Sequence, residues 1–195
     1  MMENNPAEEI NKRFRKTLEF YLRKISYQIP KSPEIISVGC GYCSEQKVLS
    51  ELFKGRFLGI DIDQECISHL KTVYEDDRLK VLCGDARELS LLVEQKADVI
   101  ITRHPNIHQD DWKEIYKECH KITKPEGILI TTFYLESEMG LAERYIKNAG
   151  YKVRACEENK VIRNKDSFLK SDEFVIVSTN WDYRSKSFFK RIFWR

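Results

Sequence analysis

The sequence predicts an α/β fold in which helices cover both faces of a doubly wound, seven-stranded and mostly parallel sheet. Three observations lead to this fold class. Short apolar segments alternate along the chain with amphipathic segments of helical periodicity. Turn and cap residues separate the segments, as at Pro125-Glu126-Gly127 and Gly150. The 195 residues, 42% of them hydrophobic, suffice for one domain with a good core.

The first expected element is an amphipathic helix at residues 7–28. Lysines and arginines lie between its apolar residues, and Pro30 and Pro33 are expected to end it. The apolar residues that recur at helical spacing are Ile10, Phe14, Leu18, Tyr21, Leu22 and Ile25.

Seven expected strands and the helices between them follow. Apolar runs predict strands at 35–38, 57–60, 79–82, 97–102, 128–133, 151–156 and 174–179. Helical patterns occupy 44–52, 64–74, 111–122 and 139–148, with a short helix or turn at 88–94. The helix at 111–122 has one apolar stripe, formed by Trp112, Ile115, Tyr116 and Cys119. Strands that alternate with helices predict a parallel sheet covered on both faces.

The chain shows no composition break, repeat or low-complexity tract, so a single domain is expected. It divides into an N-terminal helical extension at 1–30, a core at 31–180 and a basic aromatic tail at 181–195. The 33 Lys and Arg nearly balance the 31 Asp and Glu, and a net charge of +2 does not by itself imply nucleic acid. Neither a secretory leader nor a membrane span is expected, since no run of about 18 apolar residues occurs. The six cysteines do not have the spacing of a disulfide framework, which is typical of reduced thiols. A cytoplasmic protein is therefore expected.

Candidate site residues follow the first four strands. Gly39-Cys40-Gly41 comes after the first strand, and Asp61 after the second, about 20 residues further on. Gly84-Asp85-Ala86 follows the third strand, and Arg103-His104 the fourth. Ligands of doubly wound sheets bind at the carboxyl ends of the strands, where strand order reverses. Glycines for close approach and carboxylates for ribose hydroxyls and a purine amine predict a site for an adenosine-like ligand.

These motifs together resemble the class I S-adenosylmethionine-dependent methyltransferase family. ISVGCGYCSE is similar to its glycine-rich first motif, LGIDID to the acidic second, CGDARE to the third and ADVIITRH to the fourth. The segments IYKECHKITKPEGILI and ERYIKNAGYKV resemble its later helix, turn and strand units. The resemblance runs from about residue 34 to 179 and implies a Rossmann-like methyltransferase fold.

The resemblance implies an enzyme that uses S-adenosyl-L-methionine and releases S-adenosyl-L-homocysteine, with no metal. It assigns the methionine part to the first glycine loop, the ribose and adenine to the acids after strands two and three, and the sulfonium region to the end of strand four. The implied cofactor-binding residues are Gly39, Cys40, Gly41, Asp61, Ile62, Asp85, Ala86 and Arg103. Two positions depart from the family pattern, since Cys43 replaces the third glycine and Ser37 the acid often found in the first strand.

Two alternative roles for the glycine loop compete with cofactor binding of this kind. A dinucleotide site of the G-x-G-x-x-G type would need glycine at position 44, where the sequence has Ser44. A metal or redox role for Cys40 and Cys43 lacks a second pair of ligands nearby in sequence. Two small residues in a tight loop account for the cysteines more simply.

The catalytic candidates are His104 and His108, because an imidazole can accept a proton near neutral pH. The alternative is that His104 is a pocket wall and His108 a solvated loop residue. Tyr134, Glu136 and Glu138 follow the fifth strand and could face the acceptor or lie in a solvated loop.

A small-molecule methyl acceptor is favoured, because residues 102–106 do not match the Asp/Asn-Pro-Pro-aromatic pattern of enzymes that methylate nucleobase amines or glutamine. The tail NWDYRSKSFFKRIFWR interleaves basic and aromatic residues, which suits RNA or an anionic membrane surface. It could equally pack onto the domain or a second subunit. An RNA or protein acceptor and an inactive cofactor-binding partner protein therefore stay open, and the sequence does not indicate an oligomeric state.

Overall fold

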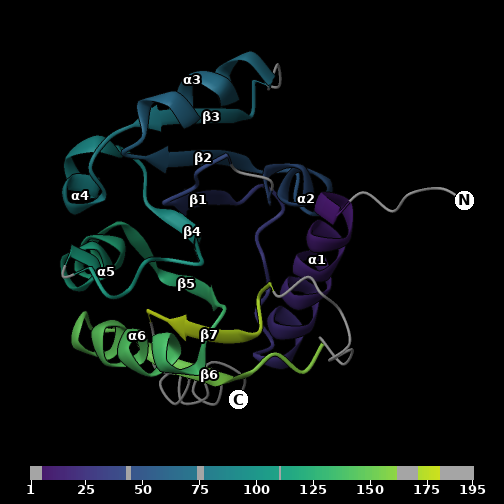
Figure 1. Ribbon diagram of the computed structural model, residues 1–195, viewed down its shortest axis with the longest axis vertical. Coiled ribbons are helices and arrows are strands. Elements are labelled where there is room, and N and C mark those ends of the chain that lie inside the picture. Colours follow the sequence, from purple (N-terminus) through teal and green to yellow (C-terminus); the bar gives the residue numbers. More distant parts are fainter. Residues whose placement is uncertain (1–5, 43–44, 74–76, 110, 162–170, 181–195) are drawn as a thin grey trace, which may run out of the picture.

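The computed structural model describes residues 6–42, 45–73, 77–109, 111–161 and 171–180 (Figure 1). Strands and helices alternate along these residues. The strands are β1 (Glu34–Val38), β2 (Arg56–Asp61), β3 (Leu79–Cys83), β4 (Ala97–Arg103), β5 (Thr123–Phe133), β6 (Lys152–Glu158) and β7 (Phe174–Thr179). The helices are α1 (Pro6–Lys24), α2 (Glu45–Leu52), α3 (Gln64–Val73), a 3-10 turn (Ala86–Glu88), α4 (Leu89–Leu92), α5 (Asp111–Ile122) and α6 (Glu136–Asn148).

The strands form one seven-stranded sheet in the order β3-β2-β1-β4-β5-β7-β6, which confirms the predicted fold class. β1 to β5 pair with one another in parallel, and β7 pairs antiparallel with both β5 and β6. Strand order reverses between β1 and β4, so the switch point opens at the carboxyl ends of these two strands.

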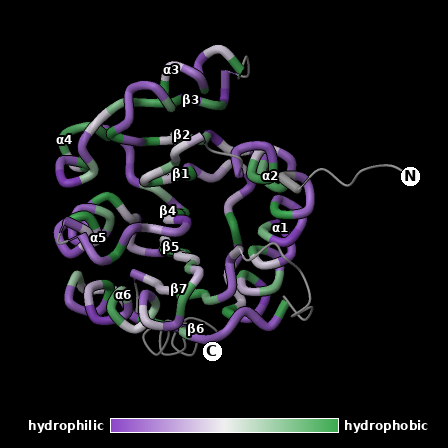
Figure 2. The backbone as a smooth tube through the Cα atoms, in the orientation of Figure 1, coloured by the Kyte–Doolittle hydropathy of each residue, from purple (hydrophilic) through white to green (hydrophobic). Residues whose placement is uncertain are grey.

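Two buried clusters lie on opposite faces of the sheet. Alternate strand residues enter each cluster, so that Ile35 and Val99 belong to one and Ile36 and Ile100 to the other. The first cluster also takes residues from α1, α2 and α3, and the second from α4, α5 and α6. In Figure 1, α1 and α2 lie on one side of the sheet and α4, α5 and α6 on the other. In Figure 2, α1 and α5 show hydrophobic and hydrophilic residues side by side, as expected of amphipathic helices.

The first helix ends earlier than the prolines suggested. α1 stops at Lys24, where Ser26 takes a positive φ of 52° and the Tyr27 N–H bonds back to the Leu22 carbonyl. This reversal at the helix end, rather than Pro30, terminates the helix. α1 packs onto the sheet with Phe14, Leu18 and Tyr21 fully or almost fully buried, so it is part of the core.

Two further element boundaries differ from the expectation. Thr123 already pairs with Ala97, so the predicted turn at 125–127 lies within β5 as a bulge, with a register shift before Ile128 pairs with Val99. α6 begins at Glu136 rather than Met139. Gly150 confirms its predicted role beyond α6, with a φ of 109° and an N–H that donates to the Lys147 carbonyl.

Among the described residues, no helix combines the length and the apolar character that crossing a membrane requires. The predicted basic aromatic tail, residues 181–195, lies outside the described residues.

Candidate functional site

A cavity of about 360 Å³ opens at the switch point of the sheet. Its walls come from α1, the loop after β1, the start of α2, the ends of β4 and β5, and the segment before β7. The lining residues are Ile10, Gly39, Cys40, Gly41, Tyr42, Glu45, Arg103, His104, Tyr134 and Ser171. The volume suits a small organic ligand.

The loop after β1 is held against β2 by its backbone. Gly39 and Gly41 have φ values of 68° and 50°, in the left-handed region that favours glycine. The N–H groups of Gly39 and Cys40 donate to the Ile60 carbonyl at 2.9 and 3.1 Å. A side-chain carbon added at Gly41 would meet no atom within 4 Å, so the loop faces open space there.

Asp61 joins this loop to the end of β2. Its Oδ2 accepts from the Gly41 N–H at 2.7 Å, and its Oδ1 accepts from the Asp63 N–H at 2.9 Å. Each carboxylate oxygen has a second lone pair, and the residue is half-buried. Asp61 is therefore oriented by the backbone and can still accept two hydroxyl protons.

The residues after β3 continue the site beyond the cavity. The Gly84 N–H donates to the Asp61 carbonyl at 2.9 Å, which brings Asp85 beside the end of β2. Arg87 donates to the Asp85 carboxylate, and these hydrogen bonds lower the pKa of Asp85. Ile62 is 69% exposed, so an apolar surface lies open next to the two acids. Ala86 is half-buried at the start of the 3-10 turn.

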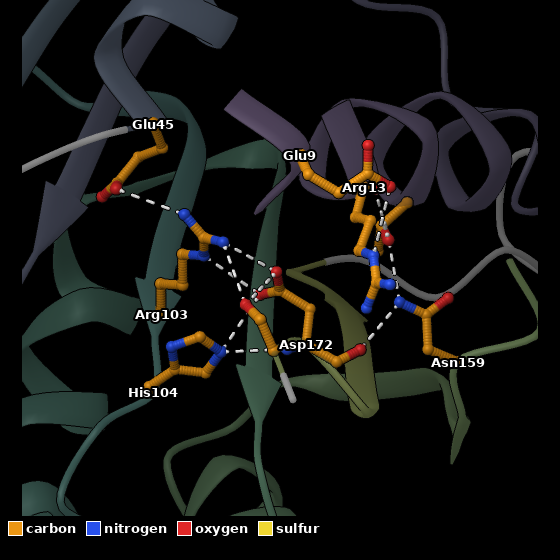
Figure 3. A network of polar contacts seen from close by, with 9 residues as sticks. Glu9, Arg13, Glu45, Arg103, His104, Asn159 and Asp172 are labelled. Atoms are coloured by element: carbon orange, nitrogen blue, oxygen red, sulfur yellow. Dashed lines mark hydrogen bonds and ion pairs between the residues drawn. The ribbon is translucent and has the colours of Figure 1, made fainter. Parts of the chain in front are cut away.

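Arg103 is the centre of a buried polar network (Figure 3). Its Nε and Nη2 donate to the two carboxylate oxygens of Asp172 at 3.0 and 2.7 Å, and Nη2 also donates to Ser171 at 3.2 Å. Glu45 lies on the other side, 3.8 Å from Nη1. Burial would raise the pKa of the Asp172 carboxyl, but His104 and Arg103 outweigh burial and hold that pKa well below its usual value.

The network extends to the first helix. The guanidinium of Arg103 lies over the ring of Phe14, 4.5 Å from its centroid. The Asn159 side chain donates to both Thr17 of α1 and the Asp172 carbonyl at 2.8 Å. α1, β4 and the start of β7 are thus fixed to one another at the floor of the cavity.

Of the two candidate histidines, the structure places His104 at the cavity. His104 has a φ of 51°, its ring stacks on Tyr134 at 3.8 Å between centroids, and its Nε2 accepts from the Asp172 N–H at 3.1 Å. The same Nε2 lies 3.2 Å from Asp172 Oδ1, so a protonated Nε2 would donate to that carboxylate. In the neutral ring whose Nε2 accepts from the Asp172 N–H, the proton is on Nδ1, on the side away from Asp172 in Figure 3. A general-base role for His104 stays a prediction. His108 is exposed in the following turn and does not line the cavity.

A buried acid from α2, Glu45, lies beside Ser37. Ser37 is buried, and its hydroxyl donates to Glu45 Oε1 at 2.9 Å. Sequence reasoning missed Glu45, although it follows the glycine loop by four residues, because an acid in the first turn of a helix is ordinarily solvated. Sequence reasoning also missed Asp172, which lies 69 residues from Arg103 and carries no local signal.

The other candidates have mixed outcomes. Tyr134 lines the cavity and is 44% exposed, whereas Glu136 and Glu138 lie in the first turn of α6, where Glu138 caps the Leu135 N–H. The Cys40 side chain is buried in the core cluster, and Cys43 and Ser44 lie outside the described residues. Within the described ranges, no group of three or more His, Cys, Asp or Glu side chains could hold a metal ion.

A comparison with family models matches residues 36–131 to the methyltransferase domain. This segment runs from β1 into β5 and contains the glycine loop, Asp61, Asp85 and Arg103. This match and the sheet topology support a class I S-adenosylmethionine-dependent methyltransferase domain in these residues.

Known proteins share this methyltransferase fold. A curated relative, the malonyl-[acyl-carrier protein] O-methyltransferase of Priestia megaterium, is 30% identical over 101 residues, which are 51% of this chain and 36% of that protein. The chain thus spans little more than a third of its curated relative. A chain in the complex of the Haloferax volcanii Trm112 methyltransferase activator with a methyltransferase matches with a TM-score of 0.67 and 13% identity, covering 91% of this chain and 93% of that one. An S-adenosylmethionine-dependent methyltransferase from Clostridium acetobutylicum has the same TM-score at 12% identity, covering 86% and 91%.

Proposed function

We propose that this chain binds S-adenosylmethionine and transfers its methyl group to a small-molecule acceptor. The observation that carries the proposal is the Asp61 carboxylate, which Gly41 and Asp63 hold by their N–H groups at the switch point of the sheet. A carboxylate fixed in this way is suited to two adjacent ribose hydroxyls. The open face of Gly41 leaves room for the ligand.

The remaining cofactor residues are assigned by their positions around Asp61. Gly39, Cys40 and Gly41 would border the methionine part. Ile62 would cover one face of the adenine, and Asp85, with the adjacent Ala86, would receive its amine. When bound, S-adenosylmethionine supplies an electrophilic methyl group, so the residues must chiefly position the acceptor and exclude water. Arg103 contributes by fixing the cavity floor through Asp172.

The acceptor would lie in the cavity beside His104 and Tyr134. Their stacked rings form a wall that could orient a planar or apolar group, and His104 Nδ1 could donate to an acceptor oxygen. A volume of about 360 Å³ supports a small acceptor. The curated relative is an O-methyltransferase by name, so oxygen acceptors are the first to test. The five described cysteines are free thiols, which supports a cytoplasmic location.

The proposal is tested by following labelled methyl groups from S-adenosylmethionine into separate pools of carboxylic acids, phenols, amines, RNA and protein. We expect transfer to a small oxygen acceptor, and the variant Asp61→Ala sets the background. Transfer to RNA or protein alone would contradict a small acceptor. Tight cofactor binding without transfer to any pool would favour a cofactor-binding partner protein.

A further inference from the structure

Glu45 is a buried carboxylate in the cavity wall that shares its nearest cation with another acid. The residue is 3% exposed, and its closest hydrogen bond comes from the neutral Ser37 hydroxyl at 2.9 Å. Arg103 approaches it only to 3.8 Å, whereas the same guanidinium makes its shorter bonds to Asp172. One guanidinium therefore faces two buried carboxylates.

Among the residues that the structure describes, the charges that face this cluster from other elements do not supply a second cation. Arg13 of α1 pairs with Glu9 at 3.5 Å, and His104 turns its Nε2 toward Asp172. Arg103 and His104 are the basic residues among those that line the described cavity. Asp61, bonded to the adjoining loop, adds a further carboxylate. Buried charges are stable when paired, so the cavity is complementary to a ligand that brings a positive charge.

We propose that Glu45 accepts a hydrogen bond from a ligand ammonium group, and that in this site the group is the α-ammonium of S-adenosylmethionine and S-adenosylhomocysteine. The inference rests on the proposed function and names a binding residue for it. Because Asp61 is proposed to bind the ribose, the ribose would lie on one side of the glycine loop. Glu45 lies beyond the other end of the same loop. The methionine part would therefore extend along Gly39 and Gly41 toward Glu45.

A thermodynamic cycle isolates this contact. It changes Glu45 on the protein and removes the α-amino group from the ligand. The probes are S-adenosylhomocysteine and its analogue without the α-amino group, because neither carries the sulfonium charge. Calorimetry would compare the wild type with Glu45→Gln and with Glu51→Gln, an exposed acid of the same helix that pairs with Arg15. The wild type should prefer the amino-bearing ligand on the order of 10- to 100-fold. Glu45→Gln should bind the two probes within about twofold of each other. Glu51→Gln should keep the wild-type preference.

Different results would overturn the proposal. An unchanged preference in Glu45→Gln would show that another group receives the ammonium. An equal loss of affinity for both probes in that variant would show that Glu45 has a purely structural role. If Glu45→Gln does not fold, the wild type alone decides, since equal affinity for the two probes excludes a paired ammonium. A folded wild type that binds neither probe would instead overturn the proposed function itself, and this inference with it.

Discussion

Replacement of Asp172 with asparagine would remove the carboxylate that neutralises Arg103 at the cavity floor. Asp172 is fully buried and accepts hydrogen bonds from Arg103 at 2.7 and 3.0 Å and from Ser171 at 2.9 Å. The Arg103 side chain is 7% exposed, so the loss of its partner would leave a largely buried guanidinium without its carboxylate. Glu45 at 3.8 Å would be the nearest remaining acid of the network.

The expected cost follows from the burial of both charges. Breaking a buried ion pair by removing one partner typically lowers the free energy of unfolding by about 3–5 kcal/mol. Because a domain of this kind is stable by roughly 5–15 kcal/mol, Asp172→Asn should shift the urea midpoint strongly. The double variant with Arg103→Met should lose less than the sum of the two single changes, because no unpaired guanidinium is left.

Urea unfolding at several pH values measures this cost. The pKa of Asp172 is lowered in the folded protein, so its contribution is complete above the ordinary aspartate pKa of about 3.9 and declines as the pH falls below that value. The penalty of Asp172→Asn should therefore be large at pH 7 and shrink in acid. Glu114→Gln, which breaks an exposed pair with Lys117, is the control and should leave the midpoint nearly unchanged. An Asp172→Asn midpoint equal to that of the control would refute the network.

Three further predictions concern single positions. Asp61→Ala should weaken S-adenosylhomocysteine binding by about 1.5–3 kcal/mol in calorimetry, and unchanged affinity would mean that this acid does not hold the ligand. Phe14→Ala should lower the free energy of unfolding by about 3–5 kcal/mol in urea, since a fully buried ring beneath Arg103 is lost; a loss below about 1 kcal/mol would show that α1 packs loosely. Gly150→Ala should cost about 1–3 kcal/mol because its φ is 109° and His120 lies 3.0 Å from the added carbon. Gly140→Ala in α6, which meets open space, should be neutral or stabilising, and equal effects at both glycines would contradict the strain argument.

The sheet could be predicted from the sequence because each strand is a separate apolar run with local turn signals. All seven strands and the reversal of strand order follow from these local patterns and from the family resemblance. The end of α1 could not be predicted, because Ser26 reverses the chain before Pro30 can act. The bulge before Ile128 could not be predicted either, because the turn residues 125–127 lie within β5 and do not precede it.

The candidate site was predictable where its residues follow strand ends. Gly41, Asp61 and Arg103 come together because the carboxyl ends of parallel strands lie at the same edge of the sheet. Asp172 was not predictable, because its pairing with Arg103 depends on how β7 enters the sheet beside β5. Glu45 was missed because its burial depends on the packing of α2 and not on its own sequence pattern.

Cofactor binding distinguishes a functional methyltransferase site from the same fold with a different function. Calorimetric titration of the wild-type protein with S-adenosylmethionine and S-adenosylhomocysteine measures it, after any carried-over ligand has been removed. We expect saturable binding of both compounds at one site per chain, with Asp61→Ala reducing both affinities. A folded, ligand-free protein that binds neither compound would contradict the proposed function.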